Sequence, residues 1–262
     1  MLWRRFRYRS GGARKASGEA QFLSWIYLVM DKRAALAAYC KLMEVIRART
    51  GAILFLANEP TGLPPFCVSE LQQLQVRMIC ETLAKACLVL HGDIAGAKST
   101  RLTTAYQADL IMNALEKLHP RFYPKPVRPG PQKDGIDGML DIADGFLTKK
   151  ELLKSYHGAS DCLHAGEIQE IVAGKYKRTN PEWIRDWTKK LFVLLNNHTI
   201  YLKDGAGAWD GKEPIKYDNG EPAPKYQVIV AMRSGPDEKP EARIFEVISR
   251  LEDLPKGSAQ QS

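Results

Sequence analysis

A long amphipathic segment at residues 69–91 constrains the fold of this chain more than any other stretch. Ser69, followed three residues later by Gln72, forms a capping-box pattern, and Gly92 stands where a helix usually ends. The apolar side chains recur at helical spacing, as expected for a helix that buries one wide face. They are Leu71, Leu74, Met78, Ile79, Leu83, Ala86 and Leu90. The segment therefore predicts a core helix around which the rest of the chain packs.

Three charged residues, Arg77, Glu81 and Lys85, follow one another at intervals of four on this predicted helix. Ion pairs at that spacing stabilise a helix modestly, so an exposed ladder of charges is one interpretation. The other interpretation is a polar cluster in which this stripe faces His157 or His164 of a later helix. If the chain has a pocket, we expect it to be lined by these five residues, the three charged ones and the two histidines.

Other segments also show helical periodicity or helix-start patterns. Thr148 with Glu151 is a second capping box, and Asn180 followed by Pro181 is a favoured helix start. A loop rich in Pro and Gly joins the first helix to the core helix, so these two should pack antiparallel. The predicted additional helices cover residues 31–57, residues 102–118, a helix opening at residue 148, a short piece at 165–174 and a helix opening at residue 181.

The period changes after residue 197. Residues 199–202, 226–232 and 243–248 are rich in Val, Ile and Tyr and are separated by Gly, Pro and Asp. They predict a small antiparallel meander packed on the helices. In contrast, residues 121–135 contain four prolines and predict an extended loop.

The predicted fold is mainly α, a bundle of five to six helices with a small C-terminal antiparallel sheet. The expected organisation follows from these periods and from the composition of the two ends. It comprises a basic N-terminal extension at residues 1–29, a helical bundle at 30–198, a β meander at 199–250 and a polar tail at 251–262.

Most of the net charge of +8 belongs to the N-terminal extension, since residues 1–18 carry six basic residues and no acidic one, which leaves +2 (8 − 6) for the rest. Three interpretations of residues 1–29 stand: a translated upstream extension, a targeting segment or a basic arm. The apolar run at residues 22–30 is too short to span a bilayer, so no membrane association is expected.

Basic residues mixed with aromatic ones could contact nucleic acid, because Arg binds phosphate and aromatic rings stack on bases. A solvated tail and an ordered proline-rich loop would explain the same residues without nucleic acid. The candidate contacts are Arg4, Arg5, Arg7, Arg9, Arg121 and Lys125.

The cysteines and histidines do not form a recognisable metal or disulfide pattern. The five cysteines lack a C-x-x-C motif, which favours small buried side chains in a reducing, cytoplasmic setting. His157, Asp161, Cys162 and His164 lie close in sequence, but the chain has no H-E-x-x-H and we expect no metal. The glycine-rich phosphate loops and the nucleophile elbow are also absent from the sequence, so no cofactor is expected.

The helical order, the central R-M-I-C-E-T-L-A-K-A-C-L-V-L-H-G-D and the later S-Y-H-G-A-S-D-C-L-H-A resemble HEPN-type helical domains over residues 30–198. In that family the active ribonucleases carry an Arg, four to six residues and then a His. No histidine of this chain follows an Arg at that distance, so the family's activity is not carried over.

Two functions remain after these exclusions. The first is a non-catalytic interaction or dimerisation module that pairs with itself or with another protein. The second is an RNA-binding or RNA-cleaving effector of HEPN type, as the resemblance implies.

Overall fold

The computed structural model describes residues 32–92, 97, 99–130, 139–163, 172–173, 179–202, 226–232 and 238–246. Residues 1–29 with Arg4, Arg5, Arg7 and Arg9, the tail 251–262 and His164 lie outside the described residues. Of the predicted short helix at 165–174, only residues 172 and 173 are described.

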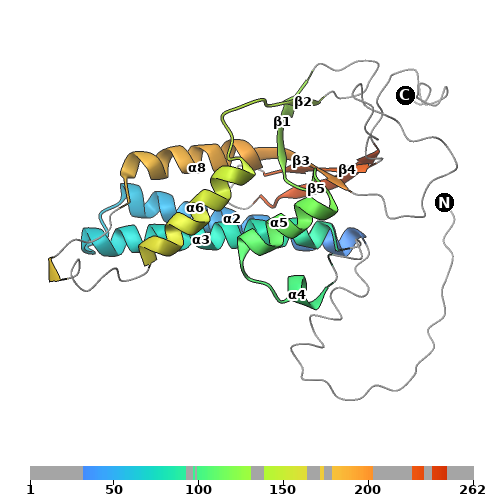
Figure 1. Ribbon diagram of the computed structural model, residues 1–262. Coiled ribbons are helices and arrows are strands. Elements are labelled where there is room, and N and C mark those ends of the chain that lie inside the picture. The colour runs from blue at the N-terminus through green and yellow to red at the C-terminus, as the bar shows by residue number, and fades with distance from the viewer. Residues whose placement is uncertain are drawn as a thin grey trace, which may run out of the picture.

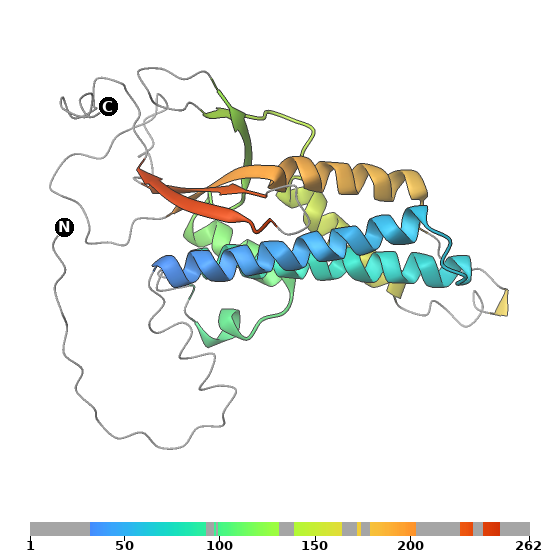
Figure 2. The ribbon, with the colours of Figure 1, turned by 180° about the vertical axis from the view of Figure 1, so that it is seen from behind.

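The protein is mainly helical, with a small antiparallel sheet, as the sequence predicts. Helices α2 (Lys32–Asn58) and α3 (Pro65–Leu90) form an antiparallel hairpin that runs the length of the bundle (Figures 1 and 2). The described part of the helical region also contains α4 (Thr100–Thr103), α5 (Ala108–Leu118), α6 (Lys149–Leu163) and α8 (Pro181–Asn196). Helices α5 and α6 both pack against α3, which makes α3 the central helix.

The start of α3 differs from the prediction. The helix begins at Pro65, four residues before Ser69, because proline is already fixed in the backbone angle that the first helical turn needs. Ser69 does not cap the helix. Its hydroxyl oxygen instead accepts a hydrogen bond from the backbone N–H of Thr179 at 3.1 Å, which ties α3 to the segment before α8.

The predicted helix at residues 102–118 is also two pieces rather than one. Helix α4 ends at Thr103 and α5 begins at Ala108, after Gln107 in an extended conformation. The neighbouring β-branched residues Thr103 and Thr104 are weak helix formers, which accounts for a break at this point.

The sheet contains five strands in the order β2-β1-β3-β4-β5, all antiparallel. The meander β3–β4–β5 confirms the three predicted strands, with small shifts of their ends. The strands are β1 (Lys125–Pro129), β2 (Met139–Asp141), β3 (Asn197–Leu202), β4 (Tyr226–Ala231) and β5 (Glu241–Glu246).

The prediction that residues 121–135 form only a loop was wrong. Strand β1 lies within that proline-rich stretch and pairs on one side with β3, through Lys125 opposite Thr199, and on the other with β2. Proline cannot donate to a ladder, but Pro126 and Pro129 still offer carbonyl oxygens, and the Pro126 carbonyl accepts from the N–H of Ile142 at 3.0 Å.

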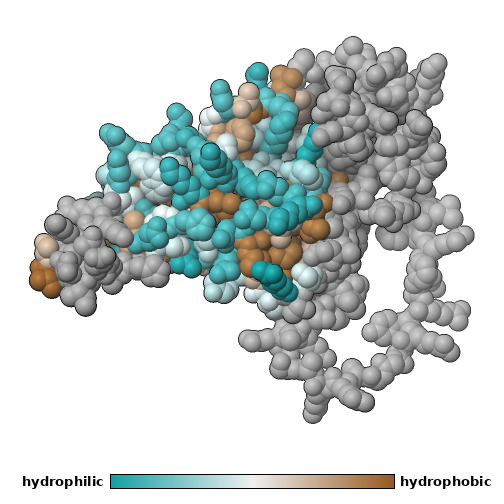
Figure 3. All heavy atoms as spheres, in the orientation of Figure 1, coloured by the Kyte–Doolittle hydropathy of each residue, from teal (hydrophilic) through white to brown (hydrophobic). Residues whose placement is uncertain are grey.

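One continuous apolar core joins the helices to the sheet. It extends from Tyr39 and Met43 of α2 through α3 and α8 to Ile200 of β3 and Val230 of β4. The face shown in Figure 3 is largely hydrophilic, as expected for helices that bury their apolar sides. Within the described ranges, no helix is long and apolar enough to cross a bilayer.

Candidate functional site

The predicted charged ladder on α3 is not an exposed surface feature. Glu81 is only 6% exposed, because helices packed against α3 surround its C-terminal half. The Nε of Arg77 donates to Oε1 of Glu81 at 3.1 Å, and Lys85 is half-buried one turn further along. The hydrogen bond to Glu81 raises the pKa of Arg77, which favours the charged guanidinium.

The cluster extends from α3 to α6 and α5 through aromatic contacts. The guanidinium carbon of Arg77 lies 5.6 Å from the centre of the Tyr156 ring, and His157 packs edge-on against the same ring at 5.4 Å. The Nε2 of His157 lies 3.8 Å from Oδ2 of Asp109, and both side chains are substantially exposed. The structure therefore places Arg77, Glu81 and His157 close together. Arg77 and Glu81 form an ion pair, and both Arg77 and His157 pack against the ring of Tyr156.

The two described candidates for nucleic-acid contact each have a partner within the chain. Lys125 forms an ion pair with Asp141 across β1 and β2. The guanidinium carbon of Arg121 lies 5.9 Å from the centre of the Tyr201 ring on β3. These contacts hold both side chains against the sheet.

The described residues contain no group of three or more His, Cys, Asp or Glu that could hold a metal ion. Asp161 and Cys162 lie in the last turn of α6, and His164 is outside the described ranges.

Three histidines are buried and link distant segments, which sequence reasoning missed. The Nε2 of His198 lies 2.7 Å from the hydroxyl of Tyr39 on α2, and burial lowers the pKa of His198 to about 4. His91 and His119 both place Nε2 within hydrogen-bond distance of the backbone carbonyl of Tyr201, at 3.1 and 2.8 Å. These rings connect α3 and α5 to β3.

A cavity of about 400 Å³ lies between α6, α8 and the N-terminal part of α3. The indole rings of Trp183 and Trp187 stand on its α8 side, with ring centres 6.4 Å apart and planes inclined by 30°. Gln73 of α3 and Leu147, which precedes α6, also line it. Trp187 lies on the buried face of α8, but nothing in the helical spacing indicates a cavity beside it.

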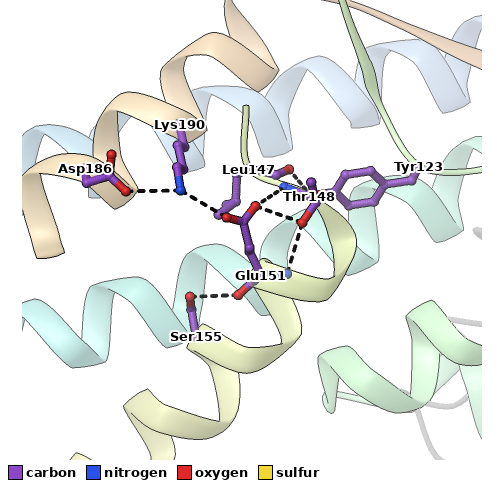
Figure 4. A network of polar contacts seen from close by, with 7 residues as sticks. All are labelled: Tyr123, Leu147, Thr148, Glu151, Ser155, Asp186 and Lys190. Atoms are coloured by element: carbon purple, nitrogen blue, oxygen red, sulfur yellow. Dashed lines mark hydrogen bonds and ion pairs between the residues drawn. The ribbon is translucent and has the colours of Figure 1, made fainter. Parts of the chain in front are cut away.

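A polar network at the start of α6 borders this cavity (Figure 4). The carboxylate of Glu151 accepts hydrogen bonds from the N–H and hydroxyl of Thr148, which confirms the predicted capping box, and from Nζ of Lys190 at 3.0 Å. Lys190 also pairs with Asp186 at 3.2 Å. The bonds from Thr148, with a smaller contribution from Lys190, lower the pKa of Glu151 to about 2, so its carboxylate is ionised near neutral pH.

Comparison of the chain with protein-family models, with curated proteins and with solved structures finds no match.

Proposed function

We propose that this protein is a non-catalytic interaction module that forms a homodimer through the closed end of its α2–α3 hairpin. The observation that carries the proposal is a group of five large apolar side chains, each 37–58% exposed, within one short stretch of chain. This hairpin-end cluster consists of Leu54, Phe55, Leu63, Leu71 and Leu74.

The cluster is concentrated where two helix ends meet. Leu54 and Phe55 lie in the last turns of α2, Leu63 lies in the connecting loop, and Leu71 and Leu74 lie in the first turns of α3. Single exposed apolar residues are normal, whereas a concentration of them marks a contact surface. Leu71 and Leu74 were predicted to face the core, and their exposure differs from that prediction.

A second copy of the chain is the partner that this surface fits best. In a two-fold symmetric dimer both copies contribute the same side chains to the interface, and the apolar side chains of the cluster would lie at its centre. Exposed Glu59 and Glu70 flank the cluster and would form part of the polar rim. A stable interface buries roughly 800 Å² per partner, so the five residues would form its centre rather than the whole of it.

The ion pairs that the charged candidate residues form within the chain support a non-catalytic role. Within the described residues, Arg77 is bound to Glu81 and Lys125 to Asp141. The resemblance to HEPN-type domains adds an analogy to a helical fold in which two subunits act together, and nothing more is taken from it.

The test is light scattering of the full chain over a range of concentrations. We expect a dimer in the wild type and a shift toward monomer in Phe55→Glu and Leu74→Glu, because each change places a charge in the apolar contact. Phe192→Glu is the matched control, since Phe192 is 62% exposed on α8, away from the hairpin end. A wild type that stays monomeric at all concentrations, or a control that dissociates as the cluster variants do, would contradict the proposal.

The RNA-directed alternative remains a prediction, and the same preparation tests it. Single-stranded RNA is mixed with the wild type, with a variant lacking residues 1–29 and with His164→Ala. Binding that is lost on deletion would assign RNA contact to the basic segment, and cleavage that is lost in His164→Ala would favour the effector.

A further inference from the structure

His91 lies at the C-terminal end of α3 and is fully buried. Its ring has two nitrogen atoms, and each lies within hydrogen-bond distance of a backbone carbonyl oxygen, one in α3 and one in β3. We propose that His91 is a pH-dependent link between α3 and β3, which bonds both elements when it is doubly protonated and only one of them when it is neutral. This inference goes beyond the proposed homodimer and does not depend on it.

The two contacts of the His91 ring leave no neutral form that satisfies both. Nδ1 lies 2.7 Å from the carbonyl oxygen of Cys87, one turn earlier in α3, and Nε2 lies 3.1 Å from the carbonyl oxygen of Tyr201 on β3. A backbone carbonyl can only accept a hydrogen bond, so each ring nitrogen has to carry a proton to make its bond. A neutral ring carries one proton and would turn the lone pair of its other nitrogen toward the facing oxygen. Only the imidazolium makes both bonds.

The register of the sheet explains why the Tyr201 carbonyl is available to a side chain. The N–H of Met232 donates to the carbonyl of Asn196 at 2.8 Å, so alternate residues of β3 from Asn196 onward direct their carbonyls to β4. Tyr201 falls in the other set, and its carbonyl points toward the β1 side. The pairing of β1 with β3 ends at Thr199, so this carbonyl lies past the end of that ladder.

The end of α3 favours a positive charge at this position. The last carbonyl groups of a helix have no partner within it and carry a partial negative charge. Nδ1 of His91 bonds one of these groups, the carbonyl of Cys87, and a histidine cation at a helix C-terminus is stabilised by the helix dipole. Hydrogen bonds from an ionised donor are also roughly twice as strong as those from a neutral one.

The titratable and charged side chains around His91 come from α3, from the end of α5 with the residues after it, and from β3. In the described structure they are Cys87, His119, Arg121, Tyr123 and Tyr201. Burial raises the pKa of Cys87 and of Tyr123, so both stay neutral near neutral pH. The positive charge of Arg121 and the burial of the ring oppose a charge on His91, whereas the two carbonyl groups and the end of α3 favour it.

His119 does not need a charge of its own to take part in this contact. Its ring centre lies 5.2 Å from that of His91, and its Nε2 lies 2.8 Å from the same Tyr201 carbonyl oxygen. A neutral His119 with its proton on Nε2 makes this bond, and the carbonyl oxygen has a lone pair for each ring. The arrangement therefore requires one cation and not two adjacent ones.

The first experiment is nuclear magnetic resonance of the wild-type full chain, labelled with nitrogen-15 in its histidine rings. Correlation of the ring nitrogens with the carbon-bound ring protons distinguishes the imidazolium from each neutral tautomer. The signals of His91 are assigned through bonds from the backbone, so no variant is needed. We expect His91 to be more than half imidazolium at pH 7, where a histidine with the usual pKa of about 6.5 is only about one quarter charged. A ring that is less than half charged at pH 7 would overturn the proposal.

The second experiment compares the urea midpoints of the wild type and His91→Gln at pH 6 and pH 9. A group that holds its proton more firmly in the folded state than in the unfolded state adds stability that is present at low pH and is lost as the pH rises. We therefore expect the midpoint of the wild type to exceed that of His91→Gln by a wider margin at pH 6 than at pH 9.

His157→Gln is the matched control, since the side chain of His157 is 58% exposed on α6. Its midpoint should stay close to that of the wild type at both pH values. A margin for His91→Gln that is equal at the two pH values, or wider at pH 9, would contradict the proposal. A control that shows the same change of margin would also contradict it, because the pH dependence would then not come from the buried ring.

Discussion

His198 is the residue whose chemistry is most changed by its position. Its Nδ1 lies 3.0 Å from the carbonyl of Leu195, which can only accept, so Nδ1 carries the proton and Nε2 accepts from the hydroxyl of Tyr39. Burial lowers the pKa of His198 to about 4 and raises the pKa of Tyr39, so both groups are neutral in the folded protein near neutral pH.

A specific dependence of stability on pH follows from His198. The pKa is about 6.5 in the unfolded chain and about 4 in the folded one, so between these values the unfolded state binds a proton that the folded state excludes. The contribution of His198 to the free energy of unfolding is therefore full above about pH 6.5 and falls as the pH is lowered toward 4. At about pH 4.5 we expect a loss of roughly 2–3 kcal/mol, measured by urea unfolding.

Other groups titrate over the same range, so the measurement needs a reference. His198→Gln cannot take up a proton, and its unfolding free energy should decrease less steeply with falling pH than that of the wild type. Parallel curves for the two proteins would show that His198 does not titrate as its burial implies.

The sequence allowed individual core residues to be predicted better than individual polar ones. Tyr39, Met43, Ile46 and Ile53 recur at helical spacing within the predicted helix at residues 31–57, and all four are buried. The burial of Glu81 could not be foreseen, because it depends on which neighbouring helices cover that side of α3. Oε1 of Gln73 and Nε1 of Trp187 are buried without a hydrogen-bond partner in the described structure, and this depends in the same way on contacts made across the bundle.

At the scale of secondary-structure elements, the start of α8 shows a local rule at work. The side chain of Asn180 accepts hydrogen bonds from the N–H groups of Glu182 and Trp183 at 2.8 and 3.5 Å, and Pro181 occupies the first helical position. This is the predicted cap, and it satisfies backbone donors that the helix itself leaves free.

We expect Asn180→Ala to lower the free energy of unfolding by about 1 kcal/mol, because the N–H groups at the start of α8 lose their acceptor. Asn113→Ala is the matched control, since Asn113 is exposed within α5, where alanine is the better helix former. Denaturant unfolding of the three proteins checks the prediction. An unchanged midpoint for Asn180→Ala would mean that water replaces the cap at no cost.

The elements that could not be predicted share a physical cause. Strand β1 has prolines at two of its five positions and no alternation of apolar residues, so its strand conformation comes from pairing with β3, which lies far away in sequence. Helix periodicity depends only on residues close together in the chain, so the sequence predicted the long helices. Strand pairing between distant segments is not local, and the predicted meander therefore lacked β1 and β2.

At the scale of the whole molecule, helices and sheet depend on each other. Tyr39 of α2 binds His198 of β3, Nη1 of Arg47 on α2 donates to the carbonyl of Glu238 before β5 at 2.7 Å, and the apolar core is continuous between the two parts. Helix α8 passes directly into β3, since Asn196 ends the helix and Asn197 begins the strand.

We therefore expect one cooperative unfolding transition for the described helices and sheet. Far-ultraviolet circular dichroism, which follows mainly the helices, and proton exchange at the β3 and β4 amides should give the same free energy of unfolding. A sheet that exchanges at a much lower free energy than the helices would show that it opens on its own.

The position of β1 also has a consequence for how the chain is made. Thr199 of β3 is 74 residues beyond Lys125 of β1, its partner in the sheet. At about 5–20 residues per second, a ribosome needs roughly 4–15 s to add those residues. During that interval β1 has an open edge, which is the state in which strands join wrong partners. Pro126 faces β2, since its carbonyl accepts from Ile142, but Pro129 alternates onto the other edge and has no N–H to offer there. A residue that hid β1 in the sequence therefore also leaves a gap in the donors of the edge that waits for β3, which disfavours pairing with a wrong strand.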